Sequence, residues 1–352
     1  MDKTLKRLCE AVAYARAHSP FYRARLCAVP RTMAEFACLP FTTAADIAAH
    51  GPEMLCIPAA NVRRMVTTGT TGPQKRLAFS DADIEATVRF FTAGMRRLCR
   101  PGDTVMICFP GDVLDGVGSL LAEALRRFRA VPLVYGHIVD LADAAAFLQA
   151  HSPRVLVGPP VPLRALALTA PSRRPRCVLL SADYAAKSVL DTLARVWRCP
   201  VYLHYGMTET GLGCAVETPA RNGLHVRGDL YIEAVDGELV VTTLCREAMP
   251  LIRYRTGDAG ALLARGRIGA LSGRIEERQK PVPIYALDEL LLGCDGVLDF
   301  SATYDEGRLT LSVLGDADAA RALSPYKNAA VTSAPGLLSD GRRKRGTVRR
   351  QR

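Results

Sequence analysis

The amino-acid sequence predicts an α/β protein with a large N-terminal domain and a small α+β C-terminal domain. From about residue 60, short apolar strand patterns alternate with helical patterns, which is typical of a largely parallel sheet. Residues 224–272 contain short strand patterns with little helix between them, which indicates an antiparallel or barrel-like subdomain. Residues 281–352 mix strands and helix again. We therefore expect domains at 1–273 and 274–352 of this 352-residue chain.

The expected elements follow in chain order. Apolar residues recur at helical spacing from Leu5 to Ala17, S-P-F-Y at 19–22 ends that helix, and L-P-F-T-T at 39–43 leads into another. Strands are expected at 104–109, 131–135, 154–157, 177–180, 201–204, 230–233, 238–244, 260–264, 297–304 and 309–314, and further helices at 119–128 and 287–292. The charged stretch from Arg274 to Lys280, followed by P-V-P, is interpreted as a hinge or linker.

Composition narrows the class of protein. No apolar run approaches the roughly 20 residues of a membrane span, and the first residues lack a secretory segment, so we expect a cytoplasmic protein without a membrane partner. The 11 cysteines stand singly, which favours reduced, buried or half-buried thiols and no zinc cluster. The net charge of +11 includes a basic tail from Arg342 to Arg352. This tail has no aromatic residue to stack on bases, so we favour a solvated terminus over nucleic-acid binding.

The segment T-T-G-T-T-G-P-Q-K can hold a polyphosphate. Its hydroxyls and backbone N–H groups can hydrogen-bond phosphate oxygens, its glycines allow close approach, and its lysine adds positive charge. The residues concerned are Thr67, Thr68, Gly69, Thr70, Thr71, Gly72 and Lys75. The segment is not a Walker A loop, because its glycines are three residues apart and Arg76 follows the lysine. The alternative is an ordinary turn between strands.

Three further motifs follow along the chain. H-Y-G-M-T-E-T-G at 204–211 places Glu209 just past a strand, where a carboxylate can hold Mg²⁺ over phosphates. R-T-G-D ends in Asp258, which could accept two ribose hydroxyls. G-R-I-E-E at 273–277 precedes the expected linker. The alternatives are a plain strand-to-helix turn at Glu209 and a hairpin with an ordinary surface aspartate at Asp258.

In order and spacing, these four segments resemble four sequence motifs of the adenylate-forming (AMP-binding) superfamily of acyl-CoA ligases and adenylation domains. These motifs are a phosphate loop, Y-G-x-T-E, R-T-G-D and G-R-x-D-D. The chain most resembles phenylacetate–CoA ligases and coenzyme F390 synthetase-like proteins, through S-P-F-Y, L-P-F-T-T, G-L-H at 223–225 and E-A-M-P-L-I-R-Y-R-T-G-D from 247. The resemblance implies a large adenylate-forming domain followed by a small mobile domain.

The resemblance also implies an activity: ATP and Mg²⁺ activate a small aromatic or short-chain carboxylic acid as an acyl-adenylate, and the acyl group passes to CoA. Residues 67–75 would hold the ATP phosphates. The remaining positions implied by the family motifs are Ser181, Ala182 and Asp183 beside the adenine, Tyr205 packing on it next to Gly206, Thr208 at the α-phosphate, Glu209 on Mg²⁺, Asp258 on the ribose, Arg274 supporting the nucleotide, and Glu276 as the pivot of the small domain.

Departures from the family motifs leave alternatives open. Lys280 is followed by P-V-P where the family has a glycine, so CoA as acceptor stays open against an amine or a protein. Arg342 stands at the place of the family's C-terminal lysine, and Lys344 is the alternative ammonium, because arginine and lysine are not interchangeable. A nucleotide-binding pseudoenzyme and a homodimer also stay open. Residues 111–118 resemble the family's acyl-side loop, which does not identify the acid.

Overall fold

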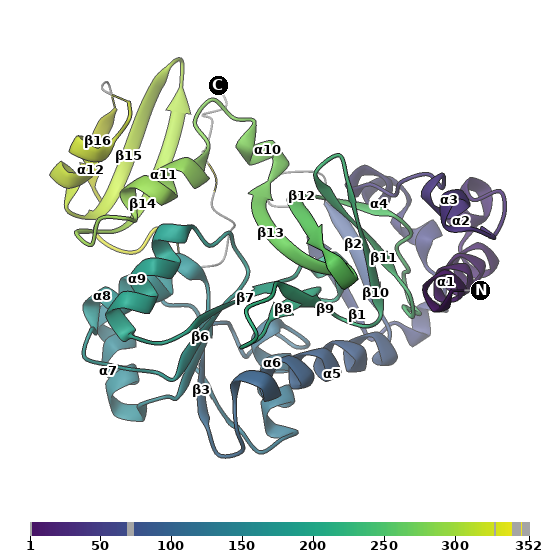
Figure 1. The fold of residues 1–352 in the computed structure, drawn as a ribbon, viewed down its shortest axis with the longest axis horizontal. Helices are drawn as coiled ribbons and strands as arrows, with labels where there is room; N and C mark the ends of the chain where they lie inside the picture. Colours follow the sequence, from purple (N-terminus) through teal and green to yellow (C-terminus); the bar gives the residue numbers. More distant parts are fainter. Residues whose placement is uncertain (1, 69–73, 327–328, 340–345, 347–352) are drawn as a thin grey trace. The chain divides into compact units, whose positions relative to one another are not determined.

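The computed structural model describes residues 2–68, 74–326, 329–339 and 346 (Figure 1). The chain forms two compact units. The first unit comprises Met1–Phe90, Gly206–Val216 and Arg221–Ser272, and the second comprises Phe91–Tyr205, Glu217–Ala220 and Gly273–Arg352. Helix α5 (Asp81–Leu98) belongs to both, because the division falls inside it. In the described part of the chain, no helix is long and apolar enough to cross a membrane.

Four helices open the first unit: α1 (Lys3–His18), α2 (Pro20–Arg25), α3 (Met33–Ala37) and α4 (Ala44–His50). Helix α1 buries Leu5, Leu8 and Val12 along one face, as the helical spacing predicts. The S-P-F-Y segment starts α2, because the Ser19 hydroxyl accepts a hydrogen bond from the Tyr22 N–H. Thr43 and Asp46 form a capping box at the start of α4. Both predicted helix positions are confirmed.

The strands of the first unit are antiparallel where their pairing is described. Strands β1 (Arg64–Thr68) and β2 (Lys75–Phe79) pair with Thr68 opposite Lys75. A second group runs in the order β10-β11-β12-β13-β9-β8. Its bounds are Leu230–Val235, Glu238–Thr243, Tyr254–Leu263, Arg267–Arg274, Leu224–Val226 and Ala215–Glu217. The predicted antiparallel subdomain is therefore present.

The second unit contains the predicted parallel sheet, in the order β7-β6-β5-β3-β4. The strands are β3 (Thr104–Ile107), β4 (Val131–Val134), β5 (Val155–Gly158), β6 (Cys177–Leu180) and β7 (Val201–Tyr205). The helices are α6 (Val117–Arg126), α7 (Leu141–His151), α8 (Pro160–Thr169) and α9 (Lys187–Trp197). Apolar side chains of β3, β5, β6, β7, α7, α8 and α9 belong to one core, in which Trp197 is fully buried.

The C-terminal residues of the second unit fold around a three-stranded sheet, β14-β15-β16. The elements are α10 (Ile275–Arg278), α11 (Ile284–Leu291), β14 (Val297–Asp305), β15 (Arg308–Gly315), α12 (Ala317–Leu323) and β16 (Ala330–Ser333). The α/β fold class with a small C-terminal sheet is thus confirmed. The charged stretch interpreted as a linker forms the single helical turn α10, and its action as a hinge stays a prediction.

A buried arginine joins these C-terminal residues to the parallel-sheet part of the same unit. Arg164 on α8 is fully buried, and its guanidinium donates to the carbonyls of Val297 and Cys294, each at 2.8 Å. Burial lowers the pKa of Arg164 to about 10, so the side chain still carries its charge at neutral pH. The boundary predicted after Gly273 stays a prediction.

The thiols are more varied than expected. Six cysteines are buried, among them Cys108 and Cys214, and burial raises the pKa of each of these two to about 12. Cys27, Cys38 and Cys245 are exposed, which corrects the expectation of buried or half-buried thiols throughout.

Candidate functional site

The segment that carries Glu209 is a tight turn in the first unit. Strand β7 ends at Tyr205, and the 3₁₀ helix η3 (Thr208–Thr210) follows after Met207. Gly211 has a φ of 76°, a left-handed conformation that glycine adopts without strain, and its N–H donates to the Thr208 carbonyl at 3.0 Å. Glu209 itself is buried, at 8% exposure. The turn therefore presents a carboxylate in a largely dry environment.

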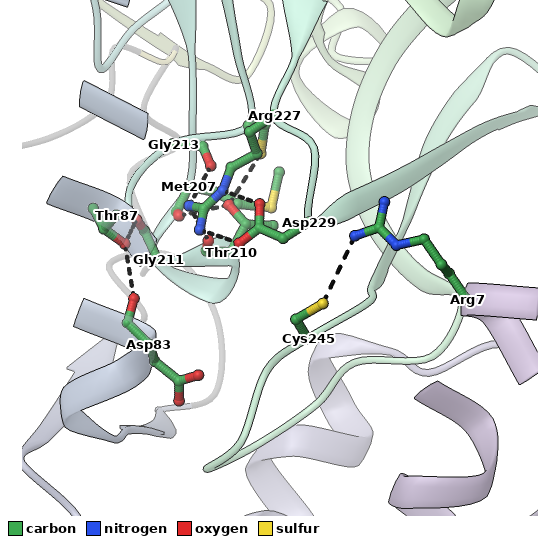
Figure 2. A network of polar contacts seen from close by, with 11 residues as sticks. Arg7, Asp83, Thr87, Met207, Thr210, Gly211, Gly213, Arg227, Asp229 and Cys245 are labelled. Carbon is green, nitrogen blue, oxygen red and sulfur yellow. Dashed lines mark hydrogen bonds and ion pairs between the residues drawn. The ribbon is translucent and has the colours of Figure 1, made fainter. Parts of the chain in front are cut away.

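Arg227 holds the carbonyl groups of this turn (Figure 2). Its Nη1 donates to the carbonyls of Thr210 at 3.3 Å and Gly213 at 3.1 Å. Its Nε and Nη2 form a two-pronged ion pair with Asp229, at 2.5 and 2.6 Å. Such a bidentate pair fixes the guanidinium plane as well as its position. The backbone that follows Glu209 is thus tied to the turn between strands β9 and β10, which carries Arg227 and Asp229.

Thr87 and Arg246 hold two more carbonyls of the turn. The hydroxyl of Thr87, on α5, donates to Gly211 at 2.8 Å (Figure 2). Arg246 Nη1 donates to the carbonyl of Glu209 itself, and its guanidinium lies 4.4 Å from the ring centre of Phe79. Desolvation lowers the pKa of Arg246 to about 10, which leaves it charged at neutral pH. Together with Arg227, these side chains hold four carbonyls within five residues.

Asp83 fixes the segment that carries Arg246. Its carboxylate accepts hydrogen bonds from the N–H groups of Glu247 at 2.9 Å and Ala248 at 3.1 Å. It also accepts the Ser80 N–H at 3.0 Å, at the start of α5. The start of this helix therefore anchors both Thr87 and the Arg246 segment to the Glu209 turn.

The Glu209 carboxylate contacts two other side chains of the first unit. Lys75 Nζ pairs with its Oε1, and the Tyr254 hydroxyl lies 3.3 Å from the same oxygen. The side chains of Lys75 and Glu209 are only 15% and 10% exposed. Residues from the glycine- and threonine-rich segment and from the Y-G-M-T-E turn, 134 positions apart, are therefore in direct contact.

This donor set fits a Mg²⁺ ion that arrives with a nucleotide. Mg²⁺ in nucleotide sites is held by one or two carboxylates together with phosphate oxygens and water. Glu209 would supply one such oxygen ligand, and its carboxylate faces the ammonium of Lys75. Within the described residues, no group of three or more His, Cys, Asp or Glu side chains could hold a metal alone.

The R-T-G-D segment is a bulge inside strand β12 and not a hairpin turn. Glu238 lies opposite Ala259 and Val240 opposite Arg255, so the β12 side contains extra residues. Gly257 takes a φ of 74° at the bulge, and its N–H donates to the Glu238 carboxylate at 2.8 Å. Asp258 is 7% exposed rather than an ordinary surface residue. The bulge sets the direction of the Asp258 side chain.

The predicted adenine-side residues lie in the second unit. Ser181 follows β6, and its hydroxyl is 2.8 Å from Nδ1 of His204 on the neighbouring strand β7. Ala182 has a φ of 76°, which is unusual for a residue with a side chain. Tyr205, the last residue of β7, is buried at 7% exposure. Asp183 accepts the N–H of Tyr184 at 2.8 Å.

Arg274 also lies in the second unit, directly after a glycine that cannot be replaced without movement. Gly273 has a φ of 81°, and a Cβ there would lie 2.3 Å from the ring of Tyr285. The Arg274 N–H donates to the Tyr285 hydroxyl at 3.0 Å. Glu277 pairs with Lys280 at 2.5 Å and accepts the Ile284 N–H at 3.1 Å, which ties the turn α10 to α11.

The predicted site residues are thus divided between the two units. Lys75, Gly206, Thr208, Glu209 and Asp258 belong to the first, and Ser181, Ala182, Asp183, Tyr205, Arg274 and Glu276 belong to the second. Gly69, Thr70, Thr71, Gly72, Arg342, Lys344 and the side chains of Thr67 and Thr68 lie outside the described residues. Their roles, like those of the described residues, stay predictions.

The side chains that surround the Glu209 turn were not predicted from the sequence. Tyr254 stands inside R-Y-R-T-G-D and Arg246 directly precedes E-A-M-P, so both lie in segments that were already singled out. Thr87 and Arg227 carry no local signal, because their partners come from distant parts of the chain and are brought together only by folding.

One family model and several known proteins match this sequence over most of its length or more than half of it. The family model described as AMP-binding enzyme matches residues 38–240, more than half of the chain. A phenylacetate–coenzyme A ligase from Aromatoleum evansii is 26% identical over 313 residues, 78% of this chain and 70% of the relative. The enzyme of the same name from Thermus thermophilus is 25% identical over 89% of this chain and 80% of the relative.

Solved structures share the fold. A 2-hydroxyisobutyryl-CoA ligase in the postadenylation state, in complex with 2-HIB-AMP, superposes with a TM-score of 0.74 at 18% identity, covering 99% of this chain and 88% of the ligase. A benzoate CoA ligase from Burkholderia xenovorans gives a TM-score of 0.57 at 15% identity, covering 77% of this chain and 65% of that enzyme.

Proposed function

This chain belongs to the AMP-binding enzyme family, and from that membership we propose that it is an ATP-dependent acid–CoA ligase. It activates a small carboxylic acid as an acyl-adenylate and transfers the acyl group to CoA. The three curated relatives that match along most of the chain are all phenylacetate–coenzyme A ligases.

The observation that carries the proposal is the contact between Lys75 and Glu209 beside Tyr254. The ammonium of Lys75 is largely buried and the carboxylate of Glu209 is buried, and both groups can contribute to binding the phosphates of a nucleotide. Lys75 can exchange its carboxylate partner for a phosphate oxygen, which leaves Glu209 to hold Mg²⁺. That ion would offset the negative charge of the phosphates when the substrate carboxylate approaches.

The first half-reaction forms a mixed anhydride. One oxygen of the substrate carboxylate attacks the α-phosphorus of ATP, a P–O bond forms, and the bond to pyrophosphate breaks. No proton is transferred in this step. Thr208 and Lys75 stabilise the charge on the phosphate oxygens, while Asp258 orients the nucleotide through its ribose hydroxyls. Ser181, Ala182, Asp183, Tyr205, Gly206 and Arg274 contribute to the adenine side.

The second half-reaction forms the thioester. The thiol of CoA loses its proton to solvent, its sulfur attacks the acyl carbon, and the C–O bond to AMP breaks. AMP leaves as a good leaving group, which is why activation precedes transfer. The enzyme thereby converts a resonance-stabilised carboxylate into an acyl donor.

The substrate is proposed to be a small aromatic carboxylate. The curated relatives are named for phenylacetate, and one structural neighbour is named for benzoate. Four finer points belong to the same proposal: Mg²⁺ as the metal, a cytoplasmic location, a homodimer, and residues 274–352 as a mobile domain that brings Arg342 or Lys344 to the reacting groups.

Pyrophosphate release tests the function. A panel of aromatic and short-chain carboxylic acids is incubated with ATP and Mg²⁺, with CoA, with hydroxylamine, or with neither. We expect at least one acid to release pyrophosphate, with multiple turnovers only when CoA or hydroxylamine removes the acyl group. Turnover with hydroxylamine but not with CoA would indicate an amine or protein acceptor. ATP binding without pyrophosphate release from any acid would indicate a pseudoenzyme.

A further inference from the structure

The structure contains a positioning device for Glu209 that the family motifs do not include. This inference rests on the proposed function, because it assumes that Glu209 holds the metal of a nucleotide. We propose that Arg227, locked by Asp229, is a positioning residue that orients the Glu209 carboxylate through the backbone of the turn and makes no contact with substrate.

The guanidinium of Arg227 donates four hydrogen bonds within the first unit. Two go to Asp229, and two go to the carbonyls of Thr210 and Gly213, which flank the left-handed Gly211 (Figure 2). The backbone N–H of Arg227 also donates to the Cys214 carbonyl at 2.9 Å. Thr210 directly follows Glu209, so the Thr210–Gly211 peptide that Arg227 holds is one residue away from the residue that carries the carboxylate. Arg227 therefore acts on Glu209 through one residue.

Burial makes this arrangement stiff. The Arg227 side chain is 5% exposed, and its guanidinium lies 5.5 Å from the ring centre of Phe90. If a buried charged side chain is removed, water cannot hold its hydrogen-bond partners in the same positions. Lysine keeps the charge, but its three donors sit on a single nitrogen, so it cannot reproduce the bidentate pair with the carboxylate and reach both carbonyls in the same geometry. Arg227→Lys consequently separates the orienting function from the charge.

The chain offers a closely matched control in the same unit. The Arg253 side chain is also 5% exposed, and it also forms a two-pronged pair, with Glu233 at 3.2 Å. It likewise donates to two backbone carbonyls, those of Ala37 and Leu39. None of these partners belongs to the Glu209 turn. Arg253→Lys thus reproduces the loss of a buried fork whose own hydrogen bonds lie outside the turn.

The experiment measures how strongly Mg²⁺ tightens nucleotide binding. The dissociation constant of an ATP analogue with a methylene bridge between the α- and β-phosphates is determined by calorimetry with and without Mg²⁺. In Arg227→Lys we expect the tightening by Mg²⁺ to fall about tenfold, as for other residues that orient a metal ligand. Binding without Mg²⁺ should change less than about twofold. In Arg253→Lys, both binding constants should match the wild type while the melting temperature falls.

Kinetics give a second readout. Arg227→Lys should raise the Mg²⁺ concentration needed for half-maximal pyrophosphate release, with a smaller effect on the KM for the acid. Asp229→Asn keeps the arginine but weakens its lock, so it should show the same pattern to a smaller degree. Asp229→Asn takes the place of Arg227→Lys in both experiments if Arg227→Lys does not fold.

The outcomes separate the inference from the proposed function. Normal Mg²⁺ tightening in folded Arg227→Lys or Asp229→Asn, in an enzyme that still forms acyl-adenylate, overturns the inference and leaves the function standing. Equal loss in Arg253→Lys also overturns it, because the effect would then be one of general stability. A wild-type protein that binds no nucleotide overturns both.

Discussion

Glu209 is the residue on which the proposed chemistry depends most. Its carboxylate is buried, faces Lys75 and the hydroxyl of Tyr254, and stands on a turn whose carbonyls are held by Thr87, Arg227 and Arg246. So much supporting structure around one carboxylate indicates that its orientation matters.

We predict that Glu209→Gln abolishes pyrophosphate release while the protein stays folded. The amide keeps the shape of the side chain but removes the charge that a metal requires. Pyrophosphate release is measured with saturating acid, and circular dichroism reports the fold. Near-normal turnover in the folded variant would rule out the metal role of Glu209.

We predict that Asp258→Ala weakens ATP binding by about tenfold or more. Two charge-assisted hydrogen bonds to the ribose would be lost, each worth about 1.5–3 kcal/mol. The bulge itself should persist, because Gly257 and the backbone of Asp258 keep their bonds to Glu238 and Thr256. Calorimetry compares this variant with Asp191→Ala, which removes an exposed partner of Lys187 on α9. Equal ATP affinity in both variants would remove Asp258 from the site.

At the scale of the residue, the sequence predicted the chemistry of individual side chains better than it predicted which side chains lie next to one another. Lys75, Glu209 and Asp258 stand in motifs whose residue types suggest phosphate, metal and ribose contacts. The environment of Glu209 could not be derived in the same way, because Arg227 and Thr87 act through contacts between distant segments. A hairpin with an ordinary surface aspartate was the alternative for Asp258, whereas the register of β11 and β12 places this residue in a bulge.

Among the elements, the 3₁₀ helix η3 depends most on a single residue, the glycine that follows it. Gly211 combines a φ of 76° with close neighbours: an added Cβ would lie 2.9 Å from Thr87 Oγ1 and 3.2 Å from Arg246 Nη2. Any side chain at this position therefore disturbs two of the groups that hold the turn.

We predict that Gly211→Ala slows acyl-adenylate formation by about tenfold or more, because it displaces donors that orient the Glu209 turn. Gly237→Ala is a matched control, since Gly237 has a φ of 78° but no heavy atom within 4 Å of an added Cβ. The left-handed conformation should cost each variant about 1–2 kcal/mol of stability. Thermal unfolding and single-turnover rates are measured together, and equal rates in the two variants would contradict the prediction.

Elements were predictable where apolar patterns are strong. The interpretation of 177–180 as a strand coincides with β6, and the helix expected from Leu5 to Ala17 is α1 with one or two more residues at each end. The pairing of β1 with β2 was not predicted, because both strands are half polar and flank the glycine- and threonine-rich segment. The turn α10 was interpreted as a linker because its charges mask its helical propensity.

At the scale of the whole molecule, the proposal requires the C-terminal region to reach the reacting groups. Residues 338 and 339 are anchored, since their N–H groups donate to the fully buried Asp299 at 2.8 and 2.6 Å. The basic tail begins shortly after this anchor. Arg342 and Lys344, which lie outside the described residues, are the proposed cationic groups.

We predict that truncation at Asp340 slows adenylate formation by about a hundredfold or more, the effect of losing one preorganised charge-stabilising donor. ATP binding should be almost unchanged, because the nucleotide contacts are proposed to lie before residue 280. Single-turnover adenylation and ATP calorimetry are performed on the same truncated protein. A full adenylation rate would exclude the tail from catalysis. A salt-dependent loss of RNA or DNA retention would instead indicate that the tail binds nucleic acid.

The most direct measurement of the central claim is the chemical identification of the intermediate. The wild-type protein is mixed in excess over ATP with Mg²⁺ and phenylacetate or benzoate, quenched at short times, and analysed by mass spectrometry. Our account predicts an acyl-AMP species that accumulates without CoA and is converted to acyl-CoA and AMP when CoA is added. It also predicts that neither species forms with Glu209→Gln. ATP that is bound but never converted to acyl-AMP, with these acids or others of the panel, would contradict the account.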